Sequence, residues 1–385
     1  MTLPVPSPDA AAHSQRLHHA ISAEIAGNGQ WMSFARFMAQ ALYAPGLGYY
    51  TAGARKFGAA GDFVTAPEMT AYFGRALAVQ VAQVMALSAP AVLEVGAGSG
   101  RLAADLLLEL ERLGALPERY EILDLSADLR ARQRETLAAA APHLLSRVSW
   151  RDDLPEAFSG AVVANELLDA MPAHGVAWRE NGIFERGVSC DDEGRFIWVE
   201  REASGLLRDA AEEIARQCAL PPGYESEIGM PARAWVADWG HRLQCGALIL
   251  IDYGFPRREF YHLQRGRGTL MCHYRHHAHP DPFFLPGLQD ITVHVDFTAV
   301  VAAGDAAGLD LLGYGGQGQF LINCGILDLL AAETPGTPDY IRATSAINKL
   351  LLPHEMGELF KVMLLGRGID TPLLGFAQGD QSRRL

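Results

Sequence analysis

A glycine-rich turn near residue 96 constrains the fold of this chain more than any other feature. The apolar run from Ala91 to Val95 predicts a buried strand, and the amphipathic run over 101–113 predicts a helix. Between them lie three alternating glycines, Gly96, Gly98 and Gly100. Glycine adopts dihedral angles that other residues avoid, and it lets a ligand lie against bare backbone at the start of a helix. The pattern therefore predicts a ligand site at a strand-to-helix turn.

The spacing of the glycines discriminates between two ligands. A dinucleotide-binding turn has a further glycine three residues after the second, where this chain has Arg101. Glu94 followed by G-x-G-x-G is instead typical of S-adenosylmethionine (SAM) sites. SAM carries no phosphate and has a positive sulfonium, so an acidic residue beside the turn suits it. Glycine-rich turns also occur in doubly wound proteins that bind no SAM, and this alternative stays open for the motif taken alone.

Strand and helix patterns alternate from Ala91 to about residue 167, which predicts a parallel sheet of the Rossmann-like α/β class. Ligands of such sheets bind at the carboxyl ends of the strands, so the residues there are candidates for the cofactor site. We expect Asp124, which closes the second strand, to accept hydrogen bonds from the two ribose hydroxyls. Asp152, after the third strand, is expected to bind the adenine amino group. A solvated loop carboxylate is the alternative for each.

The segment after the fourth predicted strand is expected to face the transferred methyl group, and its candidate catalytic residues are Asn165, Glu166 and Asp169. Methyl transfer needs an in-line approach of the nucleophile, so positioning supplies much of the rate. If the acceptor is a guanidinium, whose pKa lies above about 12, carboxylates must orient it and take up developing charge. Glu166 and Asp169 are three residues apart on an expected helical turn and would share this role. In the alternative, Glu166 only caps the turn and Asp169 is structural.

Two polar segments follow in the last third of the chain. Residues 272–281 contain four histidines and one cysteine, but the spacing is poor for zinc, so we predict no metal site. The alternating run 289–297 predicts a strand with Asp290, His294 and Asp296 on one face. We expect this face to meet the substrate, and a half-buried polar network is an equally consistent interpretation.

Composition excludes several classes of protein. The formal charge of −13 argues against a nucleic-acid partner, because phosphate binding calls for a basic face. No apolar run approaches the roughly 20 residues of a membrane-spanning helix, so no membrane span is expected. Five scattered cysteines form no C-x-x-C pair, and the first residues lack the apolar region of a secretory signal. These features predict a cytoplasmic protein.

Four consecutive ranges are expected along the chain. Residues 1–87 form a leader and helical cap, with a glycine- and aromatic-rich loop over 48–63 that could cover a cofactor. Residues 88–173 form the SAM-binding core. The short alternating strands and helices of 174–244 indicate an insertion, and 245–385 return to the core and carry the substrate-facing part.

Several long blocks of this sequence resemble the MidA family of SAM-dependent methyltransferases. They extend from about residue 30 to residue 368 and are far more specific than the glycine turn. The blocks are GYYTAGARKFGAAGDFVTAPEMTAYFG, EVGAGSGRLAADLL, YEILDLSADLRARQRETL, VVANELLDAMPAH, LILIDYG, RGTLMCHYRHHAHPDPFFLPGLQDITVHVDF and GELFKVMLLGRG.

The resemblance implies a class I SAM-methyltransferase fold with an N-terminal helical cap and a β/α insertion after the fourth strand. It implies SAM as cofactor, with Gly96, Gly98, Asp124 and the pair Asn165–Glu166 in its site and Glu68 in the cap over it. Ala97 stands where the family usually has proline.

The mitochondrial member of the family is a complex I assembly factor that methylates an arginine of a complex I subunit. The resemblance therefore implies a protein arginine methyltransferase with a protein substrate, possibly a complex I subunit. Two alternatives stay open, which are a partner-binding assembly protein with little turnover and a small-molecule methyltransferase, since fold does not fix substrate.

Overall fold

The computed structural model describes residues 3–52 and 65–385, so residues 53–63 of the predicted cofactor-covering loop lie outside the described residues. The chain forms two compact units, each assembled from three separate stretches. The first unit comprises Met1–Phe63, Leu168–Ala234 and Phe255–Asp296, and the second comprises Val64–Leu167, Trp235–Gly254 and Phe297–Leu385. The four ranges expected from the sequence divide the chain along its length, whereas these units group it in space.

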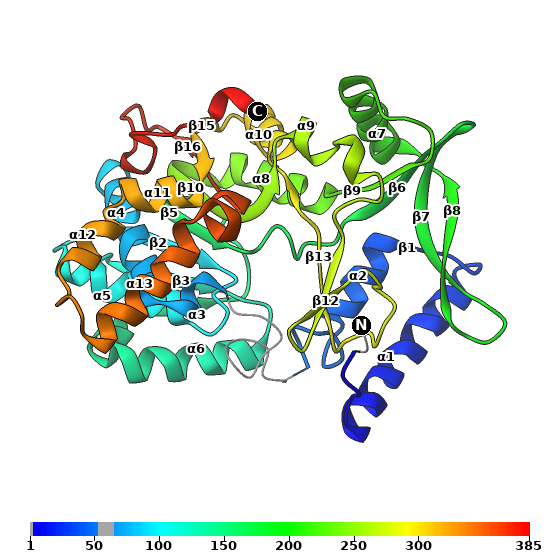
Figure 1. Ribbon diagram of the computed structural model, residues 1–385, viewed down its shortest axis with the longest axis horizontal. Coiled ribbons are helices and arrows are strands. Elements are labelled where there is room, and N and C mark those ends of the chain that lie inside the picture. The colour runs from blue at the N-terminus through cyan, green and yellow to red at the C-terminus, as the bar shows by residue number, and fades with distance from the viewer. Residues whose placement is uncertain (1–2, 53–64) are drawn as a thin grey trace. The chain divides into compact units, whose positions relative to one another are not determined.

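The second unit is built on a twisted sheet with the strand order β15-β16-β10-β5-β2-β3-β4 (Figure 1). Neighbouring strands from β4 to β10 are parallel, and β16 runs antiparallel to both β10 and β15. The predicted parallel Rossmann-like core is therefore confirmed. The strands are β2 (Ala91–Val95), β3 (Arg119–Leu123), β4 (Val148–Arg151), β5 (Phe158–Asn165), β10 (Leu243–Phe255), β15 (Asp310–Gly316) and β16 (Phe360–Arg367).

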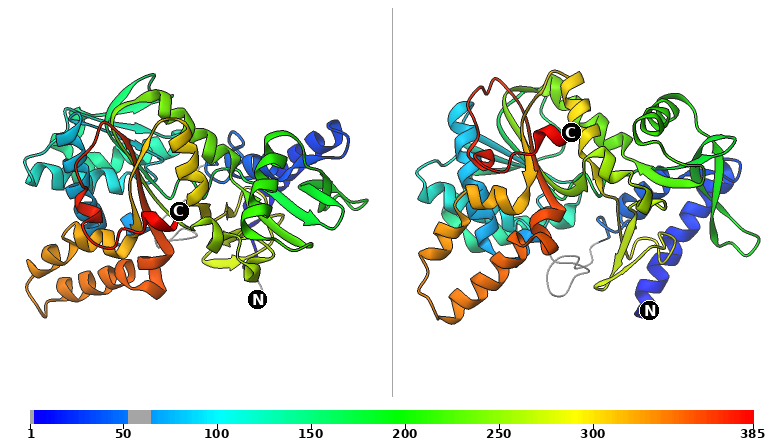
Figure 2. Two further views of the ribbon diagram at one scale, coloured as in Figure 1. Left: turned by 90° about the horizontal axis from the view of Figure 1, so that it is seen from above. Right: turned by 45° about the horizontal axis from the view of Figure 1, so that its top comes forward.

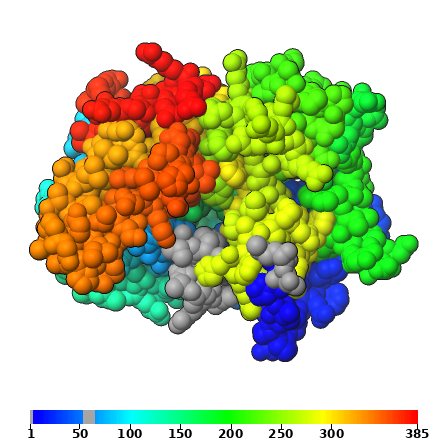
Figure 3. All heavy atoms as spheres, in the orientation of Figure 1, coloured from blue at the N-terminus to red at the C-terminus, as the bar shows by residue number. Residues whose placement is uncertain are grey.

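Helices cover both faces of this sheet (Figure 2). One face packs alternate strand residues such as Val92, Val163 and Leu364 against α4, α5 and α11. On the other face, Leu365 lies beneath Gly304 of α10. On the side drawn in Figure 3, α12 and α13 form a continuous surface, coloured orange. The helices are α3 (Ala66–Met69), α4 (Ala71–Leu87), α5 (Arg101–Arg112), α6 (Ala127–Ala140), α8 (Met230–Arg242), α10 (Phe297–Ala306), α11 (Gln317–Asn323), α12 (Ile326–Ala331) and α13 (Pro338–Leu351).

The first unit contains an antiparallel sheet with the order β1-β7-β6-β9, in which β8 also pairs with β7. The short alternating strands expected at the start of the insertion are confirmed, as β6, β7 and β8. A smaller sheet has the order β12-β11-β13. The elements are α1 (Pro8–Gly27), β1 (Met32–Ser33), α2 (Phe34–Tyr43), β6 (His174–Arg179), β7 (Gly182–Cys190), β8 (Phe196–Glu202), α7 (Gly205–Cys218), β9 (Tyr224–Ile228), α9 (Arg257–Phe260), β11 (Met271–Tyr274), β12 (His277–His279), β13 (Asp290–Thr292) and β14 (Val295–Asp296).

The continuous strand predicted over 289–297 is wrong, because the chain leaves the sheet between β13 and β14. The backbone N–H of Val293 donates to the carbonyl of Asp169 at 3.0 Å. The N–H of His294 donates to Oγ1 of Thr269 at 3.1 Å. These two N–H groups do not bond to a neighbouring strand, so the alternation of side chains between the two faces of the sheet ends at Thr292.

The helical turn predicted for Glu166 and Asp169 is also wrong. Glu166 has a φ of +51°, in the left-handed region, so the chain turns sharply directly after β5. Pro172 follows and disfavours helical dihedrals at Met171. The two carboxylates therefore do not share one face of a helix.

Helices long and apolar enough to cross a membrane are absent from the described ranges, 3–52 and 65–385.

Candidate functional site

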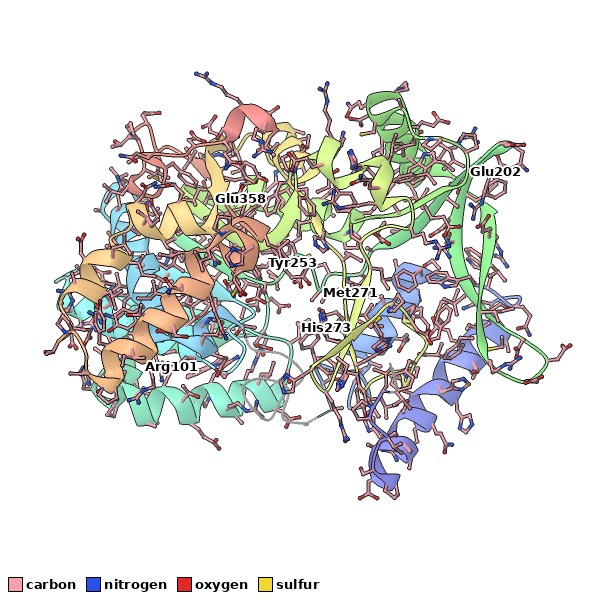
Figure 4. The ribbon with its side chains drawn as sticks, viewed as in Figure 1. Arg101, Glu202, Tyr253, Met271, His273 and Glu358 are labelled. Atoms are coloured by element: carbon pink, nitrogen blue, oxygen red, sulfur yellow. The ribbon has the colours of Figure 1, made fainter. Side chains whose placement is uncertain are left out.

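The glycine turn has the predicted backbone geometry. Gly96, Gly98 and Gly100 have φ values of +74°, +53° and +83°, all in the region that favours glycine. The N–H of Gly96 donates to the carbonyl of Leu123 at 2.9 Å, which ties the turn to the end of β3. Arg101 begins α5 (Figure 4), and its Nε donates to Asp105 at 3.0 Å. The turn thus presents backbone, with no side chain on the three glycines, to a ligand.

Glu94 lies inside β2 directly before this turn and is buried. The hydroxyl of Tyr120 donates to its Oε2 at 2.6 Å. Burial raises the pKa of Glu94 from 4.5 to about 7, the hydrogen bond from Tyr120 opposes this, and the nearby charge of Asp124 adds to it. The carboxyl group therefore changes its protonation state near neutral pH.

We expect this carboxyl group to make stability depend on pH. Between pH 4.5 and about 7 the folded protein holds a proton that the unfolded chain has released, so the free energy of unfolding falls as pH rises. The contribution is fully present below pH 4.5 and lost above about 7, with a slope of at most about 1.4 kcal/mol per pH unit. Urea unfolding at a series of pH values measures it.

Two variants identify the group responsible for this slope. Glu94→Gln should remove the part of the slope that comes from the Glu94 carboxyl group. Tyr120→Phe should extend the falling range to higher pH, because it deletes the hydrogen bond that stabilises the carboxylate. An equal slope in the wild type and in Glu94→Gln would assign the effect to other groups.

Asp124 follows β3, and its carboxylate is held from two sides. Oδ1 accepts from the N–H of Ser126 at 2.9 Å, and Oδ2 accepts from Nε2 of Gln133 at 2.8 Å. Since β3 lies beside β2, Asp124 and the glycine turn share the carboxyl edge of the sheet, as the sequence predicts. An anchored carboxylate at this position suits two adjacent hydroxyl groups.

Gln133 of α6 is a residue that the sequence reasoning missed. It is fully buried, and besides Asp124 it bonds the carbonyl of Gly98 and the indole N–H of Trp150. A signal was present, because Gln133 stands midway between Leu129 and Leu137 on the buried face of α6. A polar residue in an apolar helical position indicates a buried hydrogen-bonding role.

Asp152 lies in the exposed loop after β4, and its side chain is 86% exposed. It accepts from Nη1 of Arg130 at 2.6 Å. The same guanidinium donates through Nε to the backbone carbonyl of Asp124 at 2.7 Å. This placement fits the alternative of a solvated loop carboxylate, and adenine binding by Asp152 stays a prediction.

Glu68 of α3 contacts the glycine turn. Its Oε1 accepts a hydrogen bond from the hydroxyl of Ser99, which lies between Gly98 and Gly100. The carbonyl of Ser99 also accepts from Oγ1 of Thr136 at 2.8 Å. Within this unit, Glu68 therefore lies beside the predicted cofactor turn.

Asn165 and Glu166 lie at the carboxyl end of β5, next to β2. Asn165 Nδ2 donates to Glu166 Oε1 at 3.2 Å, and the N–H of Glu166 donates to the carbonyl of Ile251 at 2.8 Å. Asn165 Oδ1 is buried and has no hydrogen-bond partner among the described residues. A buried acceptor without a donor is costly, so this atom fits a ligand that brings one.

These groups test whether SAM fits the site. SAM offers hydroxyl and amino donors and a positive sulfonium. The second unit presents the carboxylates of Glu94 and Asp124, the open acceptor of Asn165, and the bare backbone of the turn. The residues present at this edge therefore fit the cofactor.

The other four predicted site residues belong to the first unit, where each has its own surroundings. Asp169 is buried, and its backbone carbonyl accepts from Val293. Asp290 accepts from the hydroxyl of Tyr50 at 2.9 Å, and burial together with this carboxylate raises the pKa of Tyr50 well above its ordinary value.

His294 and Asp296 contact further partners in that unit. The ring of His294 stacks on Phe255, with centroids 5.3 Å apart, and burial lowers its pKa to about 4. Asp296 accepts from Nε of Arg257 at 3.2 Å. Asp290, His294 and Asp296 thus make separate contacts in place of the single polar face that the sequence predicts. Contact with a substrate stays a prediction for these residues.

Among the residues that the structure describes, no group of three or more His, Cys, Asp or Glu side chains could hold a metal ion.

Sequence comparison agrees with this geometry. A family model for putative S-adenosyl-L-methionine-dependent methyltransferases matches residues 75–315. The chain belongs to this family. As a member, it is a SAM-dependent methyltransferase with a class I α/β fold and SAM as its cofactor, and the resemblance to the MidA family is confirmed.

Several relatives of this methyltransferase are known. A crystal structure from Burkholderia thailandensis with bound S-adenosyl-homocysteine is 51% identical, covers 100% of both chains and has a TM-score of 0.96. The mitochondrial protein arginine methyltransferase NDUFAF7 of Danio rerio is 30% identical over 86% of this chain and 82% of its own length. The Drosophila melanogaster homolog is 27% identical over 98% of this chain and 93% of its own length.

Proposed function

We propose that this methyltransferase acts on proteins and methylates arginine, with a subunit of respiratory complex I or a similar protein as its substrate. The names of the relatives from fish and fly support arginine as the acceptor. The MidA resemblance supports the complex I subunit.

The observation that carries this proposal is the pair Asn165–Glu166 at the carboxyl end of β5. Glu166 is held in the left-handed region with a φ of +51°, and its Oε1 accepts from Asn165. Strained non-glycine residues concentrate at functional sites. A guanidinium binds carboxylates through paired hydrogen bonds, so an oriented carboxylate at this edge matches arginine better than a neutral acceptor.

Each residue of the edge has a role in the proposed reaction. Asp124 binds the ribose hydroxyls, and the glycine turn supports the cofactor, which supplies a methyl group on its sulfonium. Glu166 binds the acceptor guanidinium and orients the attacking nitrogen. As the new N–CH3 bond forms, the bond between the methyl group and sulfur would break and S-adenosyl-homocysteine would leave. The attacking nitrogen would release a proton to solvent, so the methylated guanidinium keeps a single positive charge, which the Glu166 carboxylate stabilises. The catalytic role predicted for Asp169 from the sequence stays a prediction.

The test uses purified protein, SAM labelled in its methyl group, and purified bacterial complex I subunits. Acid hydrolysis followed by amino-acid analysis should find the label in methylarginine. Glu166→Gln should lower kcat about 10- to 100-fold, because the amide keeps one acceptor oxygen and loses the charge. Affinity for S-adenosyl-homocysteine should stay within about twofold of the wild type. Asp169→Asn is measured in the same assay.

The matched control is Glu180→Gln, which changes an exposed glutamate in the turn after β6 and should leave kcat unchanged. Label in a small molecule alone would contradict a protein substrate. Cofactor binding without any transfer would favour a partner-binding role. Methylarginine in a different protein would remove only the complex I assignment.

A further inference from the structure

The fully buried amide of Gln133 joins the loops after β2 and β3 to strand β4 of the central sheet. Its Nε2 donates to the carbonyl of Gly98 at 3.1 Å, after β2, and to Asp124 Oδ2 at 2.8 Å, after β3. Its Oε1 accepts from the indole N–H of Trp150, in β4, at 2.9 Å. One side chain of α6 therefore contacts both the turn and the carboxylate that surround the cofactor.

The orientation of this amide is fixed by its partners. The carbonyl of Gly98 and the carboxylate of Asp124 can only accept, and the indole N–H of Trp150 can only donate. A flipped amide would place its oxygen against two acceptors and its nitrogen against a donor. Both amide hydrogens and the amide oxygen are used, so only one rotamer satisfies the site.

The backbone of α6 is also held close to the glycine turn. A Cβ placed on Gly100 would lie 2.9 Å from the Cα of Gln133, so glycine is what permits this approach. One turn further along α6, Oγ1 of Thr136 donates to the carbonyl of Ser99 at 2.8 Å. On the other side, the guanidinium of Arg134 lies 4.3 Å from the centre of the Trp150 ring and holds that ring in place.

We propose that Gln133 is a positioning residue, which fixes the Gly98 carbonyl and the Asp124 carboxylate relative to each other and thereby sets affinity for the SAM scaffold. It acts through those two groups. The proposal rests on SAM as cofactor and is independent of the methyl acceptor, so its test needs no protein substrate.

The experiment measures binding of S-adenosyl-homocysteine by calorimetry for the wild type, Gln133→Met and Gln133→Glu. Gln133→Met keeps the length and volume of the side chain and removes every hydrogen bond. We expect its affinity to fall about 10- to 100-fold, since Asp124 loses a donor that fixes its orientation. Gln133→Glu should bind more weakly still near pH 8, because the new carboxylate faces two acceptors.

A pH profile separates positioning from simple packing. The introduced carboxyl group can donate only when protonated, and the charge of Asp124 raises its pKa. Affinity of Gln133→Glu should therefore recover as pH falls, relative to the wild type measured under the same conditions. The comparison with the wild type is required because Glu94 titrates beside the same turn, where Asp124 is a charged neighbour, with Arg130 and Arg134 on the same helix.

A second variant keeps the proposal testable if Gln133 variants do not fold. Trp150→Phe keeps an aromatic ring beneath Arg134 and deletes only the donor to Gln133 Oε1, and we expect a loss of affinity of about 3- to 10-fold. Thermal unfolding of each variant establishes that it is folded. Folded Gln133→Met, or folded Trp150→Phe, with affinity within about twofold of the wild type would overturn the proposal.

Discussion

Replacing Gly100 with alanine is expected to reduce affinity for S-adenosyl-homocysteine at least about 100-fold and to lower the free energy of unfolding by about 2–5 kcal/mol. Alanine is strained at a φ of +83°, which costs about 1–2 kcal/mol. Its Cβ would also lie 2.9 Å from the Cα of Gln133, so α6 must move away from the turn. That movement breaks the contacts of Gln133 with Gly98 and Asp124. Calorimetric binding and urea unfolding measure the two effects.

Gly114→Ala is the matched control for this variant. Gly114 also has a left-handed backbone, with a φ of +66°, but nothing lies within 4 Å of a Cβ placed there. It should lose only the strain energy of about 1–2 kcal/mol and keep its affinity for the ligand. Equal losses of affinity in the two variants would show that backbone strain, and not the approach of α6, governs binding.

Replacing Arg257 with methionine is expected to destabilise the protein by about 3–5 kcal/mol. The side chains of Arg257 and Asp296 are both 8% exposed, and their Nε and Oδ2 atoms are 3.2 Å apart. Arg257 Nη1 also donates to Oε1 of Glu213 at 2.9 Å. Removing the guanidinium takes away the nearer cation from the buried carboxylate of Asp296, whereas Arg233 lies farther away, at 4.0 Å. Chemical denaturation measures the loss.

Arg208→Met is the control, because it removes an exposed ion pair with Glu212 of the same unit. The side chains of Arg208 and Glu212 are 50% and 45% exposed, and Arg208 Nε lies 2.9 Å from Glu212 Oε1. The free energy of unfolding should therefore change by no more than about 0.5 kcal/mol. If Arg257→Met costs as little as the control, Asp296 needs no internal partner. The predicted substrate-facing role of Asp296 would then gain support over a structural one.

The sequence was sufficient for strands β2 to β5 of the central sheet and for the glycine turn, whereas β15 was not predicted. Apolar runs such as those of β2 and β5 are buried between helices on both faces, so their pattern is strong and their ends are marked by Glu94, Asp124 and Asn165. The glycine turn was predictable because its left-handed dihedrals require the residue type itself. These features depend on the hydropathy and the backbone preferences of neighbouring residues, which can be read from the sequence.

The errors arose where distant parts of the chain determine the backbone. The strand predicted over 289–297 ends early because Val293 and His294 bond to Asp169 and Thr269, which lie far away in sequence. The turn after β5 depends on the bond between the N–H of Glu166 and Ile251 of β10. Gln133 was missed for the same reason, since its three partners come from two loops and a strand that lie apart in the sequence.

The strand order has a consequence for synthesis of the protein. Strand β5, whose residues from Ala161 to Ala164 are buried, is made well before its neighbour β10. In the interval, the ribosome produces β6 to β9, which belong to the other unit. A nascent chain of that length carries an apolar strand with one unpaired edge, which is a template for aggregation. Chains stalled between residues 165 and 243 should therefore depend on chaperones more than the completed protein does.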